Sequence, residues 1–188
     1  MRTLASLVLA AVLGACASSP EGANIALQTP PRTAWIVGQE GLALGQATFT
    51  EAPAGVLIRL EFSRRGMPVG WHGLHLHQNG DCSDFAAGFH AAGGHLGMLG
   101  EVQHGLKNPA GPEAGDLPNL FAAPSGVFGA ELFSPHITLR DEPLEGRQSL
   151  LDADGTALII HAAPDDQISQ PIGGAGARIA CAALTRLP

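Results

Sequence analysis

Residues 73–82 read G-L-H-L-H-Q-N-G-D-C and contain two histidines, His75 and His77, within a short apolar run. Side chains two residues apart in a β-strand point to the same face, about 7 Å from one another along the strand. Two imidazoles in this arrangement can hold one metal ion between them. Zinc, copper, iron and nickel are the metals that imidazole ligands suit. The stretch therefore predicts a strand that carries part of a metal site.

A long segment between Asn79 and Pro118 follows this strand and shows no clear helix or strand pattern. Irregular segments of this length inside a compact domain are usually functional. This one carries His95, His104 and several acidic residues, and a further histidine, His161, lies in a later β-like run. We expect a loop that a metal organises between strands.

The composition favours one all-β domain. The chain has 188 residues, of which 45% are hydrophobic and 14% charged, with 25 glycines and 14 prolines. Such a chain is long enough for one core, and its many turn formers suit short strands joined by long ordered loops. The formal net charge of −7 argues against nucleic acid as a partner, because phosphate binding requires a basic surface.

Short runs with the apolar and β-branched character of strands recur along the chain. They are Ala34–Val37, Ala43–Thr50, Val56–Phe62, Trp71–Gln78, Asn119–Ala122, Val127–Phe133, Ala157–Ala162 and Ala177–Leu184. Two long loops separate them, one over 79–118 and one over 163–175.

Several of these blocks, in this order, resemble the copper–zinc superoxide dismutases, especially the bacterial exported form. They are G-L-H-L-H-Q-N-G-D-C-S (73–83), A-G-G-H (92–95), H-G (104–105), G-D-L-P-N-L (115–120), I-I-H-A (159–162) and G-A-R-I-A-C (176–181). The resemblance covers roughly residues 33–188. It implies an all-β fold, an eight-stranded, sandwich-like Greek-key β-barrel with two long functional loops.

The resemblance also implies the copper site. Its ligands would be His75, His77, His95 and His161. His95 would bridge copper to zinc and deliver a proton to the product, and Arg178 would attract and dock the superoxide anion beside the copper. Both residues are therefore expected to be catalytic.

The zinc side departs from the family. The resemblance implies His95, His104 and Asp116 as zinc ligands, but the block expected as G-P-H-A-G-D-L-P reads G-P-E-A-G-D-L-P at 111–118. Glu113 therefore stands where a zinc histidine is expected. Carboxylates ligate zinc at about 2.0–2.2 Å, so Glu113 can complete the set. Two alternatives stay open: Glu113 is a solvated loop acid, or His90 fills the place instead.

Asp165 stands four residues after His161. The resemblance implies that this carboxylate links a copper histidine to a zinc histidine, here His75 and His104. Acceptors of this kind fix the tautomer and the orientation of a ligating ring.

The N-terminus predicts export and a lipid anchor. Residues 1–15 combine Met1-Arg2 with a short apolar stretch, and the following L-G-A-C junction resembles the lipobox of bacterial lipoproteins, in which Cys16 is acylated. An ordinary secretory signal is the alternative. Residues 16–32 look like a flexible tether, and 33–188 form the barrel domain.

Lipidation of Cys16 would leave Cys82 and Cys181, which we expect to form a disulfide in an oxidising compartment. Two buried free thiols are the alternative. In the chain-entropy model a bridge that closes about 100 residues stabilises the fold by about 4.7 kcal/mol.

These expectations combine into one function. The chain would convert superoxide to dioxygen and hydrogen peroxide at a redox-cycling copper, with zinc alongside, and would protect the cell envelope from the periplasm, held to a membrane only by its lipid. The alternative is a non-catalytic copper-binding or storage lipoprotein on the same barrel. The oligomeric state stays open.

Overall fold

The computed structural model describes residues 29–64, 66–97, 102–144 and 146–186. The predicted signal segment 1–15, the predicted lipidation site Cys16 and most of the predicted tether 16–32 lie outside these residues. The first strand begins at Arg32. No helix in the described ranges has the length and hydropathy needed to cross a membrane.

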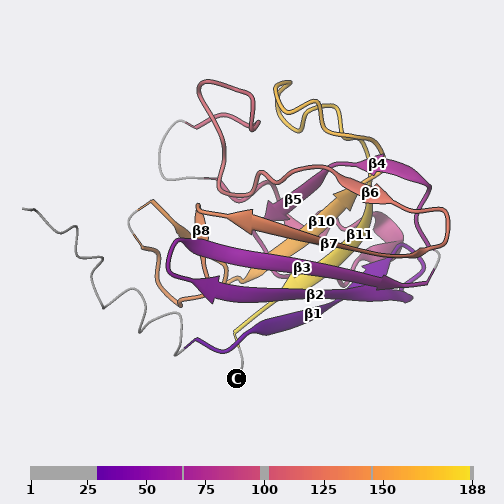
Figure 1. The fold of residues 1–188 in the computed structure, drawn as a ribbon, viewed down its shortest axis with the longest axis horizontal. Coiled ribbons are helices and arrows are strands. Elements are labelled where there is room, and N and C mark those ends of the chain that lie inside the picture. Colours follow the sequence, from indigo (N-terminus) through magenta and orange to yellow (C-terminus); the bar gives the residue numbers. More distant parts are fainter. Residues whose placement is uncertain (1–28, 65, 98–101, 145, 187–188) are drawn as a thin grey trace, which may run out of the picture.

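The described residues form strands and two short 3-10 helices, as an all-β chain requires (Figure 1). The strands are β1 (Arg32–Gly38), β2 (Ala43–Ala52), β3 (Gly55–Ser63), β4 (Gly70–His72), β5 (Leu74–His77), β6 (Leu120–Ala122), β7 (Val127–Ser134), β8 (Ile137–Thr138), β9 (Gln148–Ser149), β10 (Thr156–His161) and β11 (Arg178–Leu184). The helices are η1 (Phe85–Ala87) and η2 (His90–Ala92).

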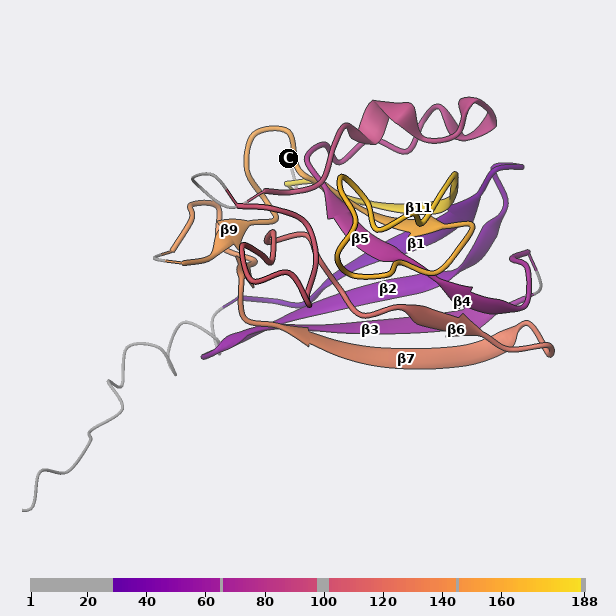
Figure 2. The same ribbon diagram turned by 90° about the horizontal axis from the view of Figure 1, so that it is seen from above.

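The main sheet has seven strands in the order β5-β10-β11-β1-β2-β3-β7, and it curls into a half-barrel (Figures 1 and 2). A separate ladder joins β4 to β6, and a short parallel pair joins β8 to β9. All eight predicted strands are present, and the all-β prediction is confirmed. Within the described residues no ladder connects β6 to β7, so hydrogen bonding does not close the barrel there.

One predicted strand, Trp71–Gln78, is split at Gly73 into β4 and β5. The N–H of Gly73 donates to the carbonyl of Ala163 at 2.8 Å, and its own carbonyl accepts from the N–H of His161 at 2.9 Å. A Cβ at Gly73 would lie 2.7 Å from the Cβ of Ala175, so only glycine fits between the strand and the loop after β10. The split lets β4 pair with β6 while β5 pairs with β10.

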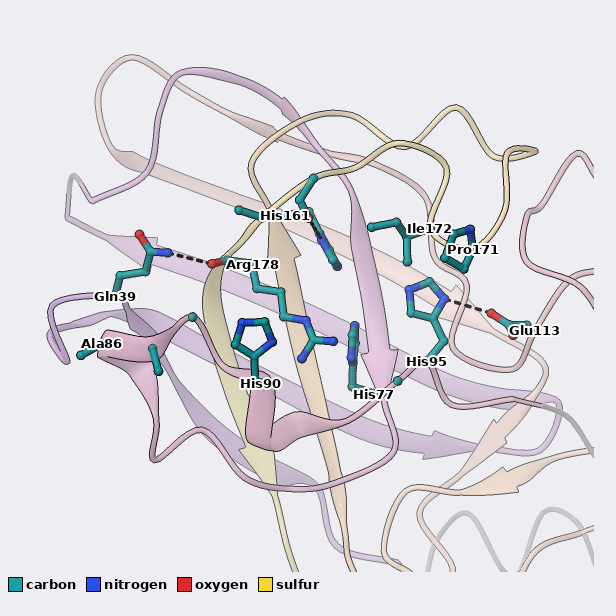
Figure 3. Close-up of a pocket in the computed structure, with 15 residues that line it drawn as sticks. Gln39, His77, Ala86, His90, His95, Glu113, His161, Pro171, Ile172 and Arg178 are labelled. Atoms are coloured by element: carbon teal, nitrogen blue, oxygen red, sulfur yellow. Dashed lines mark hydrogen bonds and ion pairs between the residues drawn. The ribbon is translucent and has the colours of Figure 1, made fainter.

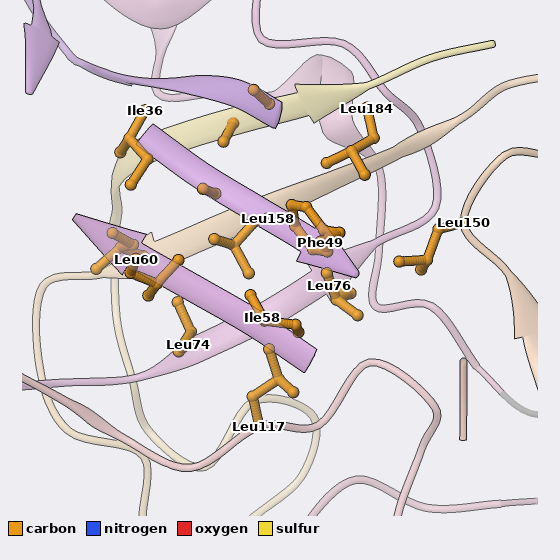
Figure 4. Packing of buried hydrophobic residues seen from close by; sticks show 14 of the residues in the cluster. Ile36, Phe49, Ile58, Leu60, Leu74, Leu76, Leu117, Leu150, Leu158 and Leu184 are labelled. Carbon is orange, nitrogen blue, oxygen red and sulfur yellow. The ribbon is translucent and has the colours of Figure 1, made fainter. Parts of the chain in front are cut away.

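The core fills the inside of the curled sheet (Figure 4). Along β3 the burial pattern alternates, with Ile58 and Leu60 pointing inward and Leu57 and Arg59 outward. This is the period-2 pattern that a half-buried strand requires. Leu74 and Leu76 of β5 are fully buried in the same core. His75 and His77 occupy the alternate positions, so the core side of β5 fixes the direction in which its histidines point.

A disulfide joins Cys82 to Cys181, with the two Cα atoms 5.8 Å apart. The predicted pairing is therefore confirmed. The bridge attaches the segment that contains η1 and η2 to β11, in the middle of the sheet. Figure 2 shows the two short helices at the edge of the molecule, outside the sheet.

Candidate metal centre

Four buried histidines meet at one end of the sheet. His75 and His77 come from β5, and His161 comes from the end of the neighbouring strand β10. His95 comes from the loop and is held against His77 by an isolated β-bridge. The ring centroids of His75 and His95 are 4.1 Å apart, and those of His77 and His161 are 5.8 Å apart.

Each of these rings leaves one buried nitrogen without a hydrogen-bond partner in the described part of the chain. These atoms are Nδ1 of His75 and Nε2 of His77, His95 and His161. The four residues place ligand atoms within 4.8 Å of one another. Buried polar atoms are rarely left unpaired, so four that converge on one point indicate a bound cation.

The other nitrogen of each ring is held by an acceptor. Nε2 of His75 lies 2.8 Å from Oδ2 of Asp165, Nδ1 of His77 donates to the carbonyl of Gly93 at 2.9 Å, and Nδ1 of His161 donates to that of Gly176 at 3.0 Å. Metal-ligating histidines regularly donate their second N–H in this way. The donor set therefore fits a transition metal such as copper, which imidazole ligands suit.

Burial keeps three of the four imidazoles neutral, those of His75, His77 and His161. Desolvation lowers the pKa of His77 to about 2 and that of His161 to about 3, and it also lowers the pKa of His75. Neutral rings offer their lone pairs to a metal without first losing a proton.

A second cluster adjoins the first and shares His95. Nδ1 of His95 lies 2.9 Å from Oε2 of Glu113 and 3.6 Å from Oδ1 of Asp116, which in turn lies 2.6 Å from Nδ1 of His104. Ligands about 2.0–2.1 Å from a tetrahedral zinc are about 3.3 Å apart, so His95, His104 and Asp116 have spacings that fit shared ligation of zinc. Glu113 contacts His95 of this cluster, but its carboxylate does not belong to the group of ligand atoms that all lie within 4.8 Å of one another.

The ligand atoms of His75, His95, His104 and Asp116 also lie within 4.8 Å of one another. His75 belongs with the first cluster, however, because its Nε2 is bonded to Asp165 and its free Nδ1 is one of the four convergent nitrogens. The second cluster is thus left with His95, His104 and Asp116, and Glu113 adjoins it through its hydrogen bond with His95.

Carboxylates control the protonation of this second cluster. Burial alone would lower the pKa of His95, but hydrogen bonds to Asp116 and Glu113 outweigh it and raise the pKa. Burial would raise the pKa of Asp116, but the bond from His95, with other donors, holds it below its ordinary value. These carboxylates thus favour the protonated form of His95 in the metal-free cluster, and a divalent cation can compete with the proton for the ring.

Asp165 lies between the two clusters. Its Oδ2 is bonded to Nε2 of His75 and its Oδ1 lies 3.2 Å from Nε2 of His104. Burial opposes ionisation, but the hydrogen bond from His75 and further donors lower the pKa of Asp165. One carboxylate therefore orients a ring from each cluster.

Two residues that hold Asp165 were not singled out from the sequence. Asn119 brackets it with two hydrogen bonds of 2.8 Å, one to its carbonyl and one from its N–H. Gly173, at φ +57°, lies so close to Asp165 that a Cβ there would collide with the carboxylate. The glycine-rich run 173–176 was the available signal for a close approach of this kind.

A cavity of about 660 Å³ leads to the histidines. His77, His95 and His161 lie in its lining, and Arg178 lies beside them (Figure 3). The two terminal nitrogens of Arg178 donate to the carbonyls of Phe89 and Gly93, each at 2.6 Å. Burial lowers the pKa of Arg178, but a guanidinium stays charged at neutral pH. The cavity therefore presents a fixed positive charge next to the first cluster.

His90 and Glu113 lie on different sides of this cavity. Figure 3 shows His90 beside Arg178, whereas Glu113 lies beyond His95 and is bonded to it. His90 is exposed on η2. Glu113 therefore contacts the second cluster through His95, whereas His90 lies on the Arg178 side of the cavity.

The chain matches known proteins over most of its length. The family model for copper/zinc superoxide dismutase matches residues 43–184. A superoxide dismutase [Cu-Zn] from Caulobacter vibrioides is 46% identical over 152 residues, which cover 81% of this chain and 84% of that protein. Superoxide dismutase [Cu-Zn] 2 from Aquifex aeolicus is 38% identical over 150 residues, 79% of this chain and 83% of the relative.

The crystal structure of a SOD-like protein from Bacillus subtilis superimposes with a TM-score of 0.71 at 34% identity, covering 81% of this chain and 97% of that one. Agreement in sequence and in fold over the same part of the chain has one explanation: the chain belongs to the copper/zinc superoxide dismutase family.

Proposed function

We propose that the four-histidine cluster holds copper and that the protein dismutates superoxide there. The observation that carries the proposal is the set of four buried ring nitrogens, unpaired among the described residues, at the end of a cavity whose wall bears Arg178. The family is an enzyme family with copper and zinc as cofactors, and the donor set found here fits both metals.

Copper supplies a one-electron couple between two oxidation states. One superoxide gives up an electron and leaves as dioxygen; a second takes up one electron and two protons and leaves as hydrogen peroxide. One half-reaction releases the electron that the other consumes, so no other oxidant or reductant is needed.

Arg178 binds the substrate in this scheme. The chain carries a formal net charge of −7, which repels an anion at long range. Local positive potential in a cleft can outweigh that repulsion close to the surface. The guanidinium is held by two backbone carbonyls, so its charge faces the cavity in one orientation.

His95 donates a proton to the superoxide that is reduced to hydrogen peroxide. Its Nε2 has no hydrogen-bond partner among the residues that the structure describes, and its ring lines the cavity, while its Nδ1 is held by the carboxylate of Glu113. A proton carried on Nε2 would be within reach of a substrate in the cavity. This two-sided environment supports a role for His95 both as bridging ligand and as proton donor.

Zinc would occupy the second cluster, with His95, His104 and Asp116 as ligands and Glu113 as the fourth. Asp165 would orient His75 and His104 toward their metals. Zinc here would order the loop that supplies four ligands, since that loop has little regular structure of its own.

The first test compares purified, copper-loaded protein with a His161→Ala variant in a superoxide-consumption assay, after a chelator has removed loose copper. We expect the parent to be active and the variant to lose its activity. His136→Ala, which removes a histidine outside both clusters, is the matched control and should remain active. Copper-loaded parent protein without activity would leave a copper-storage role, which the cavity arginine does not favour.

Export to the periplasm and lipid attachment at Cys16 are a second part of the proposal. The Cys82–Cys181 disulfide supports it, because such bonds persist in oxidising compartments. A Cys16→Ser variant should leave the membrane fraction, whereas the parent should be found there. Equal recovery of both proteins with membranes would count against lipidation.

A further inference from the structure

We propose that Glu113 opens the second metal site to the active-site cavity, so that its zinc has a coordination position that small molecules can reach. This inference rests on the proposed function, because it takes the second cluster as the zinc site. It concerns the residue at which the chain departs from the family pattern.

The exposure of the ligands is uneven. The side chains of His104 and Asp116 are 1% and 0% exposed, whereas that of Glu113 is 20% exposed. Glu113 lines the cavity together with His95 and Arg178. The second cluster is therefore closed on the side of His104 and Asp116, and it reaches solvent on the side of Glu113.

The carboxylate of Asp116 is also held by more hydrogen bonds than the carboxylate of Glu113. Oδ1 of Asp116 accepts from His104, and its Oδ2 accepts from the backbone N–H groups of Gly105 at 2.7 Å and Glu113 at 2.9 Å. Both oxygens of Asp116 are therefore fixed. Oε2 of Glu113 is held by His95 alone, and within the described residues no protein group bonds its Oε1.

A carboxylate with one unrestrained oxygen can bind a metal through one atom or two, and it can move toward the cavity. A histidine would offer one nitrogen from a rigid ring. Structural zinc sites are closed, whereas sites with three firm protein ligands keep a position for water or another small ligand. With His95, His104 and Asp116 as firm ligands and Glu113 as a mobile one, this site belongs to the second kind.

The first experiment measures zinc loss to a small chromogenic chelator from copper- and zinc-loaded protein. We expect Glu113→His to slow the loss by roughly tenfold, the scale on which changes around a metal ligand act. Glu113→Gln should speed it, because a neutral amide oxygen binds zinc more weakly. Glu61→Gln, the same change at an exposed position of β3, is the matched control and should release zinc at the parent's rate.

The second experiment places Co²⁺ in the zinc site while copper is kept reduced and therefore colourless. The parent should show the weak visible bands of cobalt with more than four ligands, and Glu113→His the stronger bands of a tetrahedral site. Equal zinc loss from the parent and both Glu113 variants would overturn the inference. So would equal cobalt spectra, or a parent protein that binds copper but no second metal.

Failure of the proposed function would look different. It would appear as absent superoxide consumption in copper-loaded protein, whatever the zinc and cobalt measurements give. If Glu113→His does not fold, Glu113→Gln still tests the inference. If Glu113 were a loop acid that does not contact zinc, this variant would lose zinc at the parent's rate.

Discussion

Single residues in this site each restrain several neighbours. The carbonyl of Gly93 accepts from both His77 and Arg178, so one backbone atom aligns a ring of the first cluster with the charge in the cavity. The carboxylate of Asp165 contacts His75 of the first cluster and His104 of the second, so it orients one ring in each. Because these contacts are shared, a substitution at one position should change the behaviour of residues that it does not replace.

Arg178→Ala should lower the rate of superoxide consumption and weaken its dependence on ionic strength. Charge-lined clefts raise association rates by about 10- to 1,000-fold, an effect for which superoxide dismutases are themselves a known example. Salt screens such attraction over about 8 Å at 0.15 M. Arg59→Ala removes an equal charge from the outer face of β3 and serves as control. The steering role fails if both variants keep the parent's rate and salt dependence.

Asp165→Asn should weaken the binding of both metals, by about 10- to 100-fold, because outer acceptors hold ligand rings in place. Titration with a competing chelator measures both affinities. Asp166→Asn alters the neighbouring acid, which is exposed and whose carboxylate, within the described residues, accepts hydrogen bonds only from Ile168 and Ser169 of its own turn. If the affinity for only one of the two metals fell, Asp165 would be shown to orient a ligand of one cluster alone.

At the scale of elements, the junction between β4 and β5 places the site. The chain pairs with β6 before Gly73 and with β10 after it, and the loop after β10 packs directly on the junction. The disulfide attaches the other long loop to β11. Both loops thus approach the histidines from strands that the core already holds rigid.

Gly73→Ala should destabilise the protein by about 1–3 kcal/mol, the usual cost of forcing extra atoms into a packed site. The added methyl would press on Ala175 and, at 3.3 Å, on the Cβ of Asp165. Denaturant unfolding of metal-free protein gives the free energy of unfolding. Gly97→Ala meets no atom within 4 Å and should stay within about 0.5 kcal/mol of the parent. Equal stability of the two variants would contradict the close packing at Gly73.

At the scale of the whole molecule, the residues that form the metal site lower the stability of the metal-free protein. The metal-free fold buries several imidazoles whose pKa values are lowered by desolvation. An unfolded chain would protonate these rings near their ordinary pKa of about 6.5. Bound metals would occupy the same nitrogens and stabilise the folded state by mass action.

The stability of the metal-free protein should therefore fall as pH drops below about 6.5. Between that value and the folded pKa of about 2 for His77 and about 3 for His161, the unfolded state binds more protons, so acid favours unfolding. Each ring contributes up to about 1.4 kcal/mol per pH unit. The raised pKa of His95 acts in the opposite sense, since its contribution is present in acid and lost as pH rises.

Three rings with lowered pKa oppose one with raised pKa, so the loss in acid should prevail. Denaturant unfolding at pH 7, 6 and 5 measures it, and His77→Gln should flatten the profile. A free energy of unfolding that does not change over this range would contradict neutral burial of the histidines.

Local spacing determined much of this protein. Period-2 alternation was enough to place His75 and His77 on one face of a strand, and the eight predicted runs correspond to the strands observed. The motif blocks indicated the family, and the disulfide predicted between the last two cysteines is present. These features depend on neighbours within a few residues, which the sequence displays directly.

Only the tertiary structure decided the rest. The contact of Glu113 with His95, the restraint of Asp165 by Asn119 and Gly173, and the split at Gly73 each depend on segments that are apart in the chain. Asp165 lies ninety positions from His75, yet the two side chains are in hydrogen-bond contact. Such contacts follow from how a curled sheet closes around its core, because packing sets which loop side chains arrive at the same point and which oxygens remain free.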